Sequence, residues 1–183
     1  MTGLFFALLA TLIVGIGARD QLLVARLAER QGARPSLLLV ALASGALAAG
    51  LAAWGGAQVA ELMAGRARLL VVALALVLAG LEMLVLAPRR APLEPTHSLG
   101  AFAIVIFAVQ LTDAARFLVF AIAVLTRAPL TSGLGGAIGA MAVVTAGWAA
   151  FALLRSPGLV WLRRGLGLAL LLIGLAVGPM AIG

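Results

Sequence analysis

The sequence predicts an all-α integral membrane protein with six transmembrane helices, arranged as a 3+3 inverted repeat. Hydrophobic residues make up 64% of the 183 residues and charged residues 10%, and the mean hydropathy is +1.23, far outside the range of soluble domains. Landmark residues of the first half also recur in the second half at a fixed spacing. Six apolar runs approach the roughly 20 residues that cross a bilayer: residues 4–28, 37–54, 69–86, 99–125, 130–154 and 159–180.

The first run opens the chain, where an apolar segment can instead be a cleaved signal peptide. No positive residue precedes LFFALLATLIV, and no convincing small-residue cleavage site follows it. We therefore expect residues 4–28 to form the first span, with Arg19 and Asp20 inside it. In the alternative, the span ends at Ala18, and LLVARLAERQG lies at the membrane surface as an amphipathic segment.

The second and fifth runs carry the clearest sign of a repeat. RPSLLLVALASGALAAGLAAW aligns with APLTSGLGGAIGAMAVVTAGW. At that offset the matching residues are Pro35 with Pro129, Gly45 with Gly139, Trp54 with Trp148, and, in the third run of each half, Gly80 with Gly174. Each half has three helices, an odd number, so the second half enters the membrane from the opposite side. Residues 1–87 and 99–183 are the predicted repeats, joined by a proline-rich cytoplasmic linker at 88–98.

Arginines predict how the spans are oriented. The net charge is +7, and all thirteen basic residues are arginine. One side of the membrane receives Arg26, Arg30, Arg34, Arg89, Arg90, Arg155, Arg163 and Arg164, whereas the other receives Arg66, Arg68 and Arg127. The positive-inside rule places the richer side in the cytoplasm and both termini outside. We expect anionic lipid headgroups as partners on the cytoplasmic side, and no nucleic acid, because the chain has no basic tail.

Polar residues interrupt the fourth run. Gln110, Thr112, Asp113 and Arg116 follow LGAFAIVIFAV and precede FLVFAIAVL, so Asp113 lies deep in the span. A charged side chain at a helix centre costs about 3 kcal/mol, so these residues must face the bundle interior and find partners. Asp113 and Arg116 are three residues apart and can pair within their own helix.

If the two halves are equivalent, the charges of the first run are equally deep. Arg19 and Asp20 are adjacent and point about 100° apart on a helix, so we expect them to find partners on other helices. Gly17, Asp20 and Gln21 share one helix face.

These two segments resemble the small six-helix calcium/manganese transporter family of cation/proton antiporters. Each half of that family carries Glu-x-Gly-Asp-Lys/Arg-Ser/Thr on its first helix, commonly followed by Gln. In GIGARDQ, the residues Gly17, Arg19 and Gln21 occupy the Gly, Lys/Arg and Gln positions. In QLTDAAR, Asp113 matches the family carboxylate, and Gln110 stands where Glu would be. Both motifs are eroded. The resemblance implies cation/proton antiport through a midplane site between the halves.

The departures change the charge of this site. Asp20 and Asp113 against Arg19 and Arg116 sum to zero, and a neutral cavity offsets little of the dehydration of manganese or calcium. Glu82 either restores one negative charge or sits at the membrane boundary paired with an arginine. The candidate ion- or substrate-binding residues are Gly17, Asp20, Gln21, Gln110, Thr112 and Asp113. Asp20 and Asp113 are the candidate metal ligands, Arg19 and Arg116 are charge partners, and Glu82 is an additional acid.

Three functions remain open. The first is secondary transport of a cation, manganese or calcium by resemblance, by proton antiport. The second is export of another small solute, such as an anion, held by Arg19 and Arg116. The third is a membrane scaffold whose site has collapsed into salt bridges. We expect no enzyme and no cofactor, because the sole histidine, His97, lies in the linker and the chain has no cysteine. Pairs of small residues favour close helix packing and leave a homodimer open.

Overall fold

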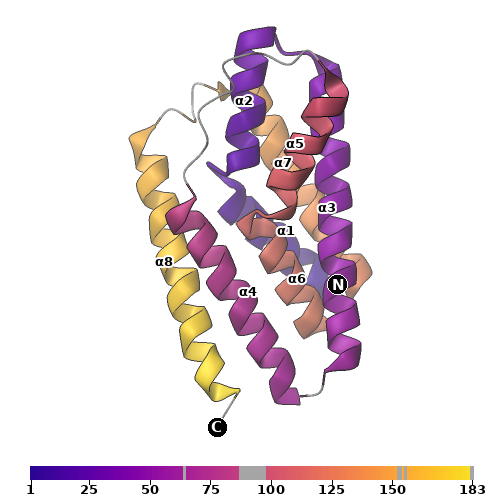
Figure 1. The fold of residues 1–183 in the computed structure, drawn as a ribbon, viewed down its shortest axis with the longest axis vertical. Coiled ribbons are helices and arrows are strands. Elements are labelled where there is room, and N and C mark those ends of the chain that lie inside the picture. The colour runs from indigo at the N-terminus through magenta and orange to yellow at the C-terminus, as the bar shows by residue number, and fades with distance from the viewer. Residues whose placement is uncertain (64, 87–97, 152–153, 155, 182–183) are drawn as a thin grey trace.

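The computed structural model describes the whole chain except residues 64, 87–97, 152–153, 155 and 182–183. Most of the predicted linker, with Arg89, Arg90 and His97, therefore lies outside the described residues, as does Arg155. The described residues are almost entirely helical (Figure 1). The helices are α1 (Thr2–Gly15), α2 (Arg19–Gln31), α3 (Pro35–Leu62), α4 (Gly65–Val85), α5 (Leu99–Leu111), α6 (Ala114–Thr126), α7 (Pro129–Ala149) and α8 (Pro157–Met180).

The described helices provide four to six candidate membrane spans. Helices α3, α4, α7 and α8 are each long and apolar enough to cross a bilayer. The pairs α1–α2 and α5–α6 pass the same test only jointly, and they are bent by 57° and 54°. This architecture is consistent with a multi-pass membrane protein.

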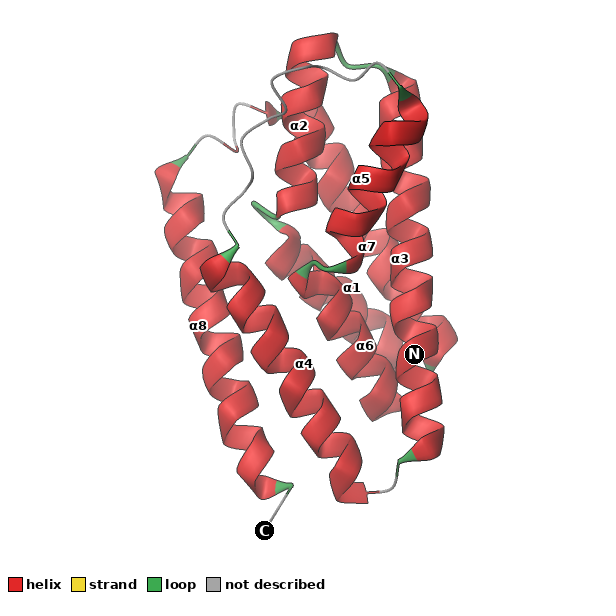
Figure 2. Ribbon diagram, in the orientation of Figure 1, coloured by secondary structure: helices red, strands yellow, loops and turns green. Residues whose placement is uncertain are grey.

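Two short breaks replace the unbroken helices that the sequence predicted over residues 4–28 and 99–125. Figure 2 shows both breaks as loops in the middle of the molecule. At the first break Gly17 has φ +73, a conformation that favours glycine, and the extended Ala18 caps α2. At the second break the Asp113 carboxylate accepts a hydrogen bond from the Ala115 N–H and caps α6. The prediction of two continuous helices was wrong because both segments carry their own helix-ending signals.

Glycines bring several helices into close backbone contact. A methyl group placed on Gly80 of α4 would lie 2.6 Å from the Gly167 carbonyl oxygen of α8. On Gly174 of α8 it would lie 2.8 Å from the Ala73 carbonyl oxygen of α4. Gly139 of α7 approaches α1 in the same way. Small residues therefore serve packing within this bundle, as expected for membrane helices.

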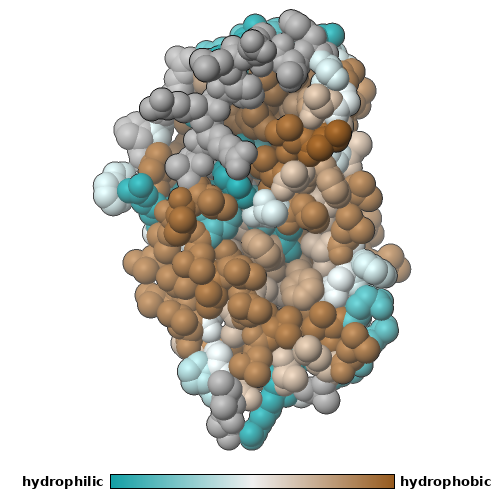
Figure 3. Space-filling model, in the orientation of Figure 1, coloured by the Kyte–Doolittle hydropathy of each residue, from teal (hydrophilic) through white to brown (hydrophobic). Residues whose placement is uncertain are grey.

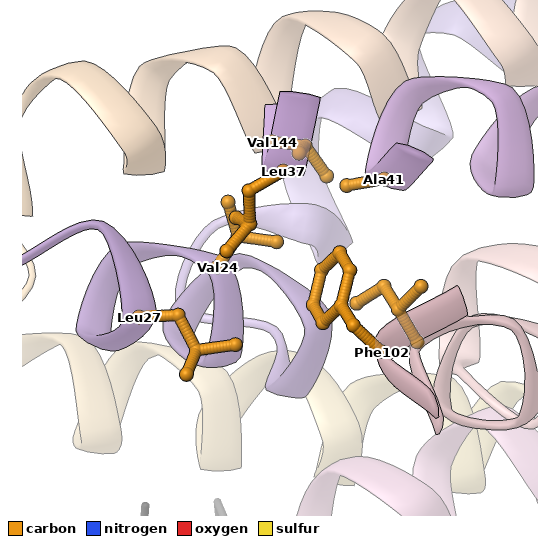
Figure 4. Close-up of a cluster of buried hydrophobic side chains, with 7 residues drawn as sticks. Val24, Leu27, Leu37, Ala41, Phe102 and Val144 are labelled. Carbon is orange, nitrogen blue, oxygen red and sulfur yellow. The ribbon is translucent and has the colours of Figure 1, made fainter. Parts of the chain in front are cut away.

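Apolar side chains cover the outside as well as parts of the inside. Figure 4 shows a buried cluster that joins α2, α3, α5 and α7; its members are Val24, Leu27, Leu37, Ala41, Phe102, Ile106 and Val144. Large hydrophobic residues are exposed on every long helix, and they cover most of the face drawn in Figure 3. Such a surface matches a lipid environment, because lipid tails are as apolar as the side chains that face them.

Candidate functional site

A set of charged side chains lies buried where the two breaks meet. These residues, called the charge cluster below, are Arg19, Asp20, Glu82, Asp113, Arg116 and Arg163. They come from α2, α4, the cap of α6, α6 itself and α8. Asp113 is 1% exposed and Glu82 is 4% exposed, while Arg19 is partly buried. Three acids face three arginines, so the cluster is formally neutral.

Glu82 is the acid with the most complete set of partners. Its Oε1 accepts from Arg19 Nε at 2.6 Å, and its Oε2 accepts from Arg163 Nη2 at 2.5 Å. The structure therefore pairs Glu82 with arginines inside the bundle. Short hydrogen bonds between two charged partners are the strongest kind in proteins.

Arg19 connects the first break to the second. Besides Glu82, its Nη2 donates to the Thr112 carbonyl oxygen at 2.9 Å and to Thr112 Oγ1 at 3.3 Å. Thr112, a predicted ligand, is exposed and belongs to the second break. Arg19 thus meets the expectation of partners on other helices.

Sequence reasoning missed Arg163, which it assigned to the basic cytoplasmic side. Its side chain is buried, and its Nη1 donates to the Val14 carbonyl oxygen at 3.2 Å. Its Nη2 lies 3.6 Å from Asp113 Oδ1, in addition to its bond with Glu82. A charge count could have found Arg163: once Glu82 is included, three acids face only two arginines, and a third cation is needed for neutrality.

Gln21 supports the first break. Its Oε1 accepts from the Gly17 N–H at 2.8 Å, and its Nε2 donates to the Val143 carbonyl oxygen at 2.8 Å. The Gln21 N–H also donates to Asp20 Oδ1 at 2.7 Å. The side-chain oxygen that we expected to face an ion is therefore used to hold the turn.

The predicted residues of the two halves do come together. Gln110 Nε2 donates to Asp20 Oδ2 at 3.4 Å and to the Ala41 carbonyl oxygen at 3.2 Å. Asp20 also interacts electrostatically with Asp113 and with Arg116. Carboxylates near both helix breaks thus share one buried region.

The second break contains polar atoms without hydrogen-bond partners. They are Gln110 Oε1, Asp113 Oδ1 and the Nε and Nη2 atoms of Arg116. The predicted bond between Asp113 and Arg116 is not what the structure shows: Asp113 Oδ2 caps α6, and Oδ1 faces Arg163. Leaving a buried donor or acceptor unpaired costs about 1–3 kcal/mol, and such groups in a native structure call for water, an ion or a ligand.

A cleft of about 130 Å³ leads to the charge cluster between α4, α8 and the first break. Its walls include the exposed Leu86 and Val160, and it extends to the buried Gly17 and Arg163. Arg164 also lines it, and the Arg164 guanidinium lies over the Trp161 ring at 5.7 Å. The cleft therefore joins the surface to one arginine of the cluster.

Compared with known proteins, the chain matches no family model, no curated protein and no solved structure. In the described part of the chain, no three His, Asp or Glu side chains are grouped so that they could hold a metal ion. A cation bound to acids of the charge cluster would therefore need further oxygens from amides, hydroxyls or carbonyls.

Proposed function

We propose that the protein is a secondary transporter that moves a cation in exchange for protons through the charge cluster. The observation that carries this proposal is the hydrogen bond from Gln110, three residues before Asp113, to Asp20, which brings two buried carboxylates, each beside a helix break, into one region. Broken helices that place charged groups at the centre of a bundle are the usual construction of transporter sites. Five of the six charges are buried, and without partners they would cost about 15 kcal/mol; a site of this kind accounts for their presence.

We further propose that residues 1–87 and 99–183 are inverted repeats of three spans each. Each half has a bent pair, then a helix that begins on proline, then a final helix. Some contacts are reciprocal as well: α1 packs on α7 as α5 packs on α3, and α2 packs on α7 as α6 packs on α3, although α4 also packs on α6. An even number of spans puts both termini on one side, and the arginine distribution favours the outside.

In the proposed cycle, arginines and the transported cation alternate as counter-ions of the carboxylates. The neutral cluster represents the cation-free state, in which no acid is left without a positive partner. A cation that reaches a protonated Asp113 releases that proton as it binds, and this exchange is the proposed coupling to proton movement. A cation that displaces a guanidinium instead releases no proton. Manganese and calcium are the first cations to test, because both prefer oxygen ligands.

Reconstituted vesicles test this function. We expect manganese or calcium uptake driven by a pH gradient, abolished by Asp113→Asn and unchanged by Glu61→Gln, a control at an exposed carboxylate. Absence of flux for every divalent and monovalent cation, in a preparation shown to be folded, would contradict the proposal.

A second candidate function is favoured by Arg116. Two of its buried guanidinium nitrogens have no hydrogen-bond partner, which is the arrangement that an anionic solute would complete. If this candidate is correct, vesicles will take up a small carboxylate or phosphate, and Arg116→Gln will abolish the uptake. A folded protein with neither cation nor anion flux would favour the scaffold instead.

A further inference from the structure

Oxygen atoms from three separate elements surround the guanidinium of Arg163. Glu82 Oε2 of α4 lies 2.5 Å from Nη2, the Val14 carbonyl oxygen of α1 lies 3.2 Å from Nη1, and Asp113 Oδ1 lies 3.6 Å from Nη2. Two carboxylates and one carbonyl form the kind of shell that hard cations bind. In this structure the positive charge among them belongs to the chain itself.

We infer that Arg163 is a tethered cation, which fills a cation-binding site in the present conformation and competes with a free cation for it. This inference rests on the proposed function, because it assigns the position that the transported cation takes. Arg163 is then a positioning and specificity residue that sets how tightly a cation can bind.

Arg163 satisfies these oxygens incompletely, which indicates that the oxygens form a site rather than a simple salt bridge. Asp113 Oδ1 is buried and has no hydrogen-bond partner, although it faces Arg163 Nη2. Arg163 Nε is buried and has none either. A purely structural salt bridge gains most when every such atom is paired, so the spare acceptor marks capacity for another ligand.

The cleft gives a free cation access to these oxygens and gives the Arg163 side chain space into which it can move away from them. Arg163 is buried, while the neighbouring Arg164 lines the same cleft and is exposed. Gly17 forms part of the cleft without a side chain to obstruct it. A long arginine side chain can move its charged head along apolar walls toward water, so Arg163 can leave the oxygens without any helix unfolding.

Charge arithmetic gives the size of the expected effect. With Arg163 the cluster sums to zero, and without it the cluster carries one net negative charge beside an accessible cleft. Attraction between unit charges a few ångströms apart in a protein interior exceeds what a tenfold change in affinity requires. Removing the tethered charge should therefore tighten cation binding by at least about tenfold.

The test uses guanidinium, the group that Arg163 itself places in the site, and manganese as a second probe. Full-length protein in nanodiscs is titrated with each ion at millimolar concentration while thermal unfolding is followed. We expect both Arg163→Gln and Arg163→Ala to be stabilised by guanidinium, with an affinity at least about tenfold tighter than that of the wild type. Arg164→Gln, the matched control in the same cleft, should behave as the wild type.

Equal ion affinities in wild type, Arg163→Gln and Arg163→Ala would overturn the inference. A variant that folds only when guanidinium or manganese is added supports it, whereas variants unfolded with and without both ions contradict it. Vesicle flux separates this result from the proposed function. If the Arg163 variants bind ions more tightly but the wild type shows no flux, the proposed transport function is rejected and the cation site stands. If the wild type shows flux but the variants do not bind more tightly, the role of Arg163 is rejected and the transport function stands.

Discussion

The two helix breaks have similar bends but opposite hydrogen-bond balances. At the first break, Gln21 pairs with the Gly17 N–H and with the Val143 carbonyl, and both Asp20 oxygens accept hydrogen bonds. At the second break, Gln110, Asp113 and Arg116 all retain buried atoms without a hydrogen-bond partner. A satisfied break is a fixed part of the scaffold, whereas an unsatisfied one has capacity for a ligand. Asp113 of the second break, with its unpaired oxygen, is therefore where binding should be sought.

The two breaks also differ in backbone conformation. The first uses a glycine at φ +73, which no other residue adopts without strain. The second turns at Thr112 and Asp113, both with negative φ, and is closed by a side-chain cap. The backbone of the second turn therefore does not require glycine.

The largest effect should come from Glu82, which is linked to both breaks through Arg19 and Arg163. Glu82→Ala leaves two guanidinium groups without their main partner, so we expect the free energy of unfolding to fall by about 3–5 kcal/mol. Chemical unfolding in detergent micelles measures the change. For Glu61→Ala, at an exposed position, the free energy of unfolding should fall by less than about 0.5 kcal/mol. Equal losses would mean that the charge cluster contributes nothing to stability.

Two matched glutamine substitutions test the comparison directly. Gln21→Met leaves the Gly17 N–H of the first break unpaired, at a cost of about 1–3 kcal/mol. Gln110→Met takes a donor from Asp20 and from the Ala41 carbonyl, but both bonds are long, at 3.4 and 3.2 Å. The substitution also removes the unpaired Gln110 Oε1, so we expect a loss at the lower end of the same range, about 1 kcal/mol. The same unfolding measurement applies, and a larger loss at Gln110 would reverse the assignment of scaffold and binding site.

The two turn residues should differ from each other, and Thr112 should give the smallest effect of all. Gly17→Ala forces a side chain into the left-handed region, at about 1–2 kcal/mol. Its new methyl would meet only Leu159 Cβ at 3.9 Å, so packing adds no penalty. Thr112→Ala, at an exposed position, should change the free energy of unfolding by about 0.5 kcal/mol or less. If both substitutions were equally mild, the first turn would not depend on glycine.

Patterns local in sequence predicted much of the fold. Runs of apolar residues predicted the long helices, and Gly80 and Gly174, matched across the halves, pack on α8 and α4. The cost of burying charge predicted that Asp20 and Asp113 face the interior, which their burial bears out. These inferences need only the composition, the spacing of the repeat and the free-energy cost of burying a charge.

Tertiary arrangement decided the rest. Arg163 lies in the first part of α8, directly before Arg164, so positive-inside counting grouped the two, although one side chain is buried and the other exposed. The partners of Asp113 also differ from expectation: as a helix cap, it directs one oxygen to the backbone and the other to Arg163. An i, i+3 rule assumes a continuous helix, and the break before α6 removes that assumption.

The glycine contacts between α4 and α8 have an electrostatic consequence. Gly80 lies two residues from Glu82, and Gly167 lies one turn from Arg163. The distance between α4 and α8 at these glycines therefore sets the separation of the Glu82 carboxylate and the Arg163 guanidinium. A group inserted between the two helices would lengthen this ion pair. A side chain bulkier than glycine at either position would therefore move the carboxylate and the guanidinium apart.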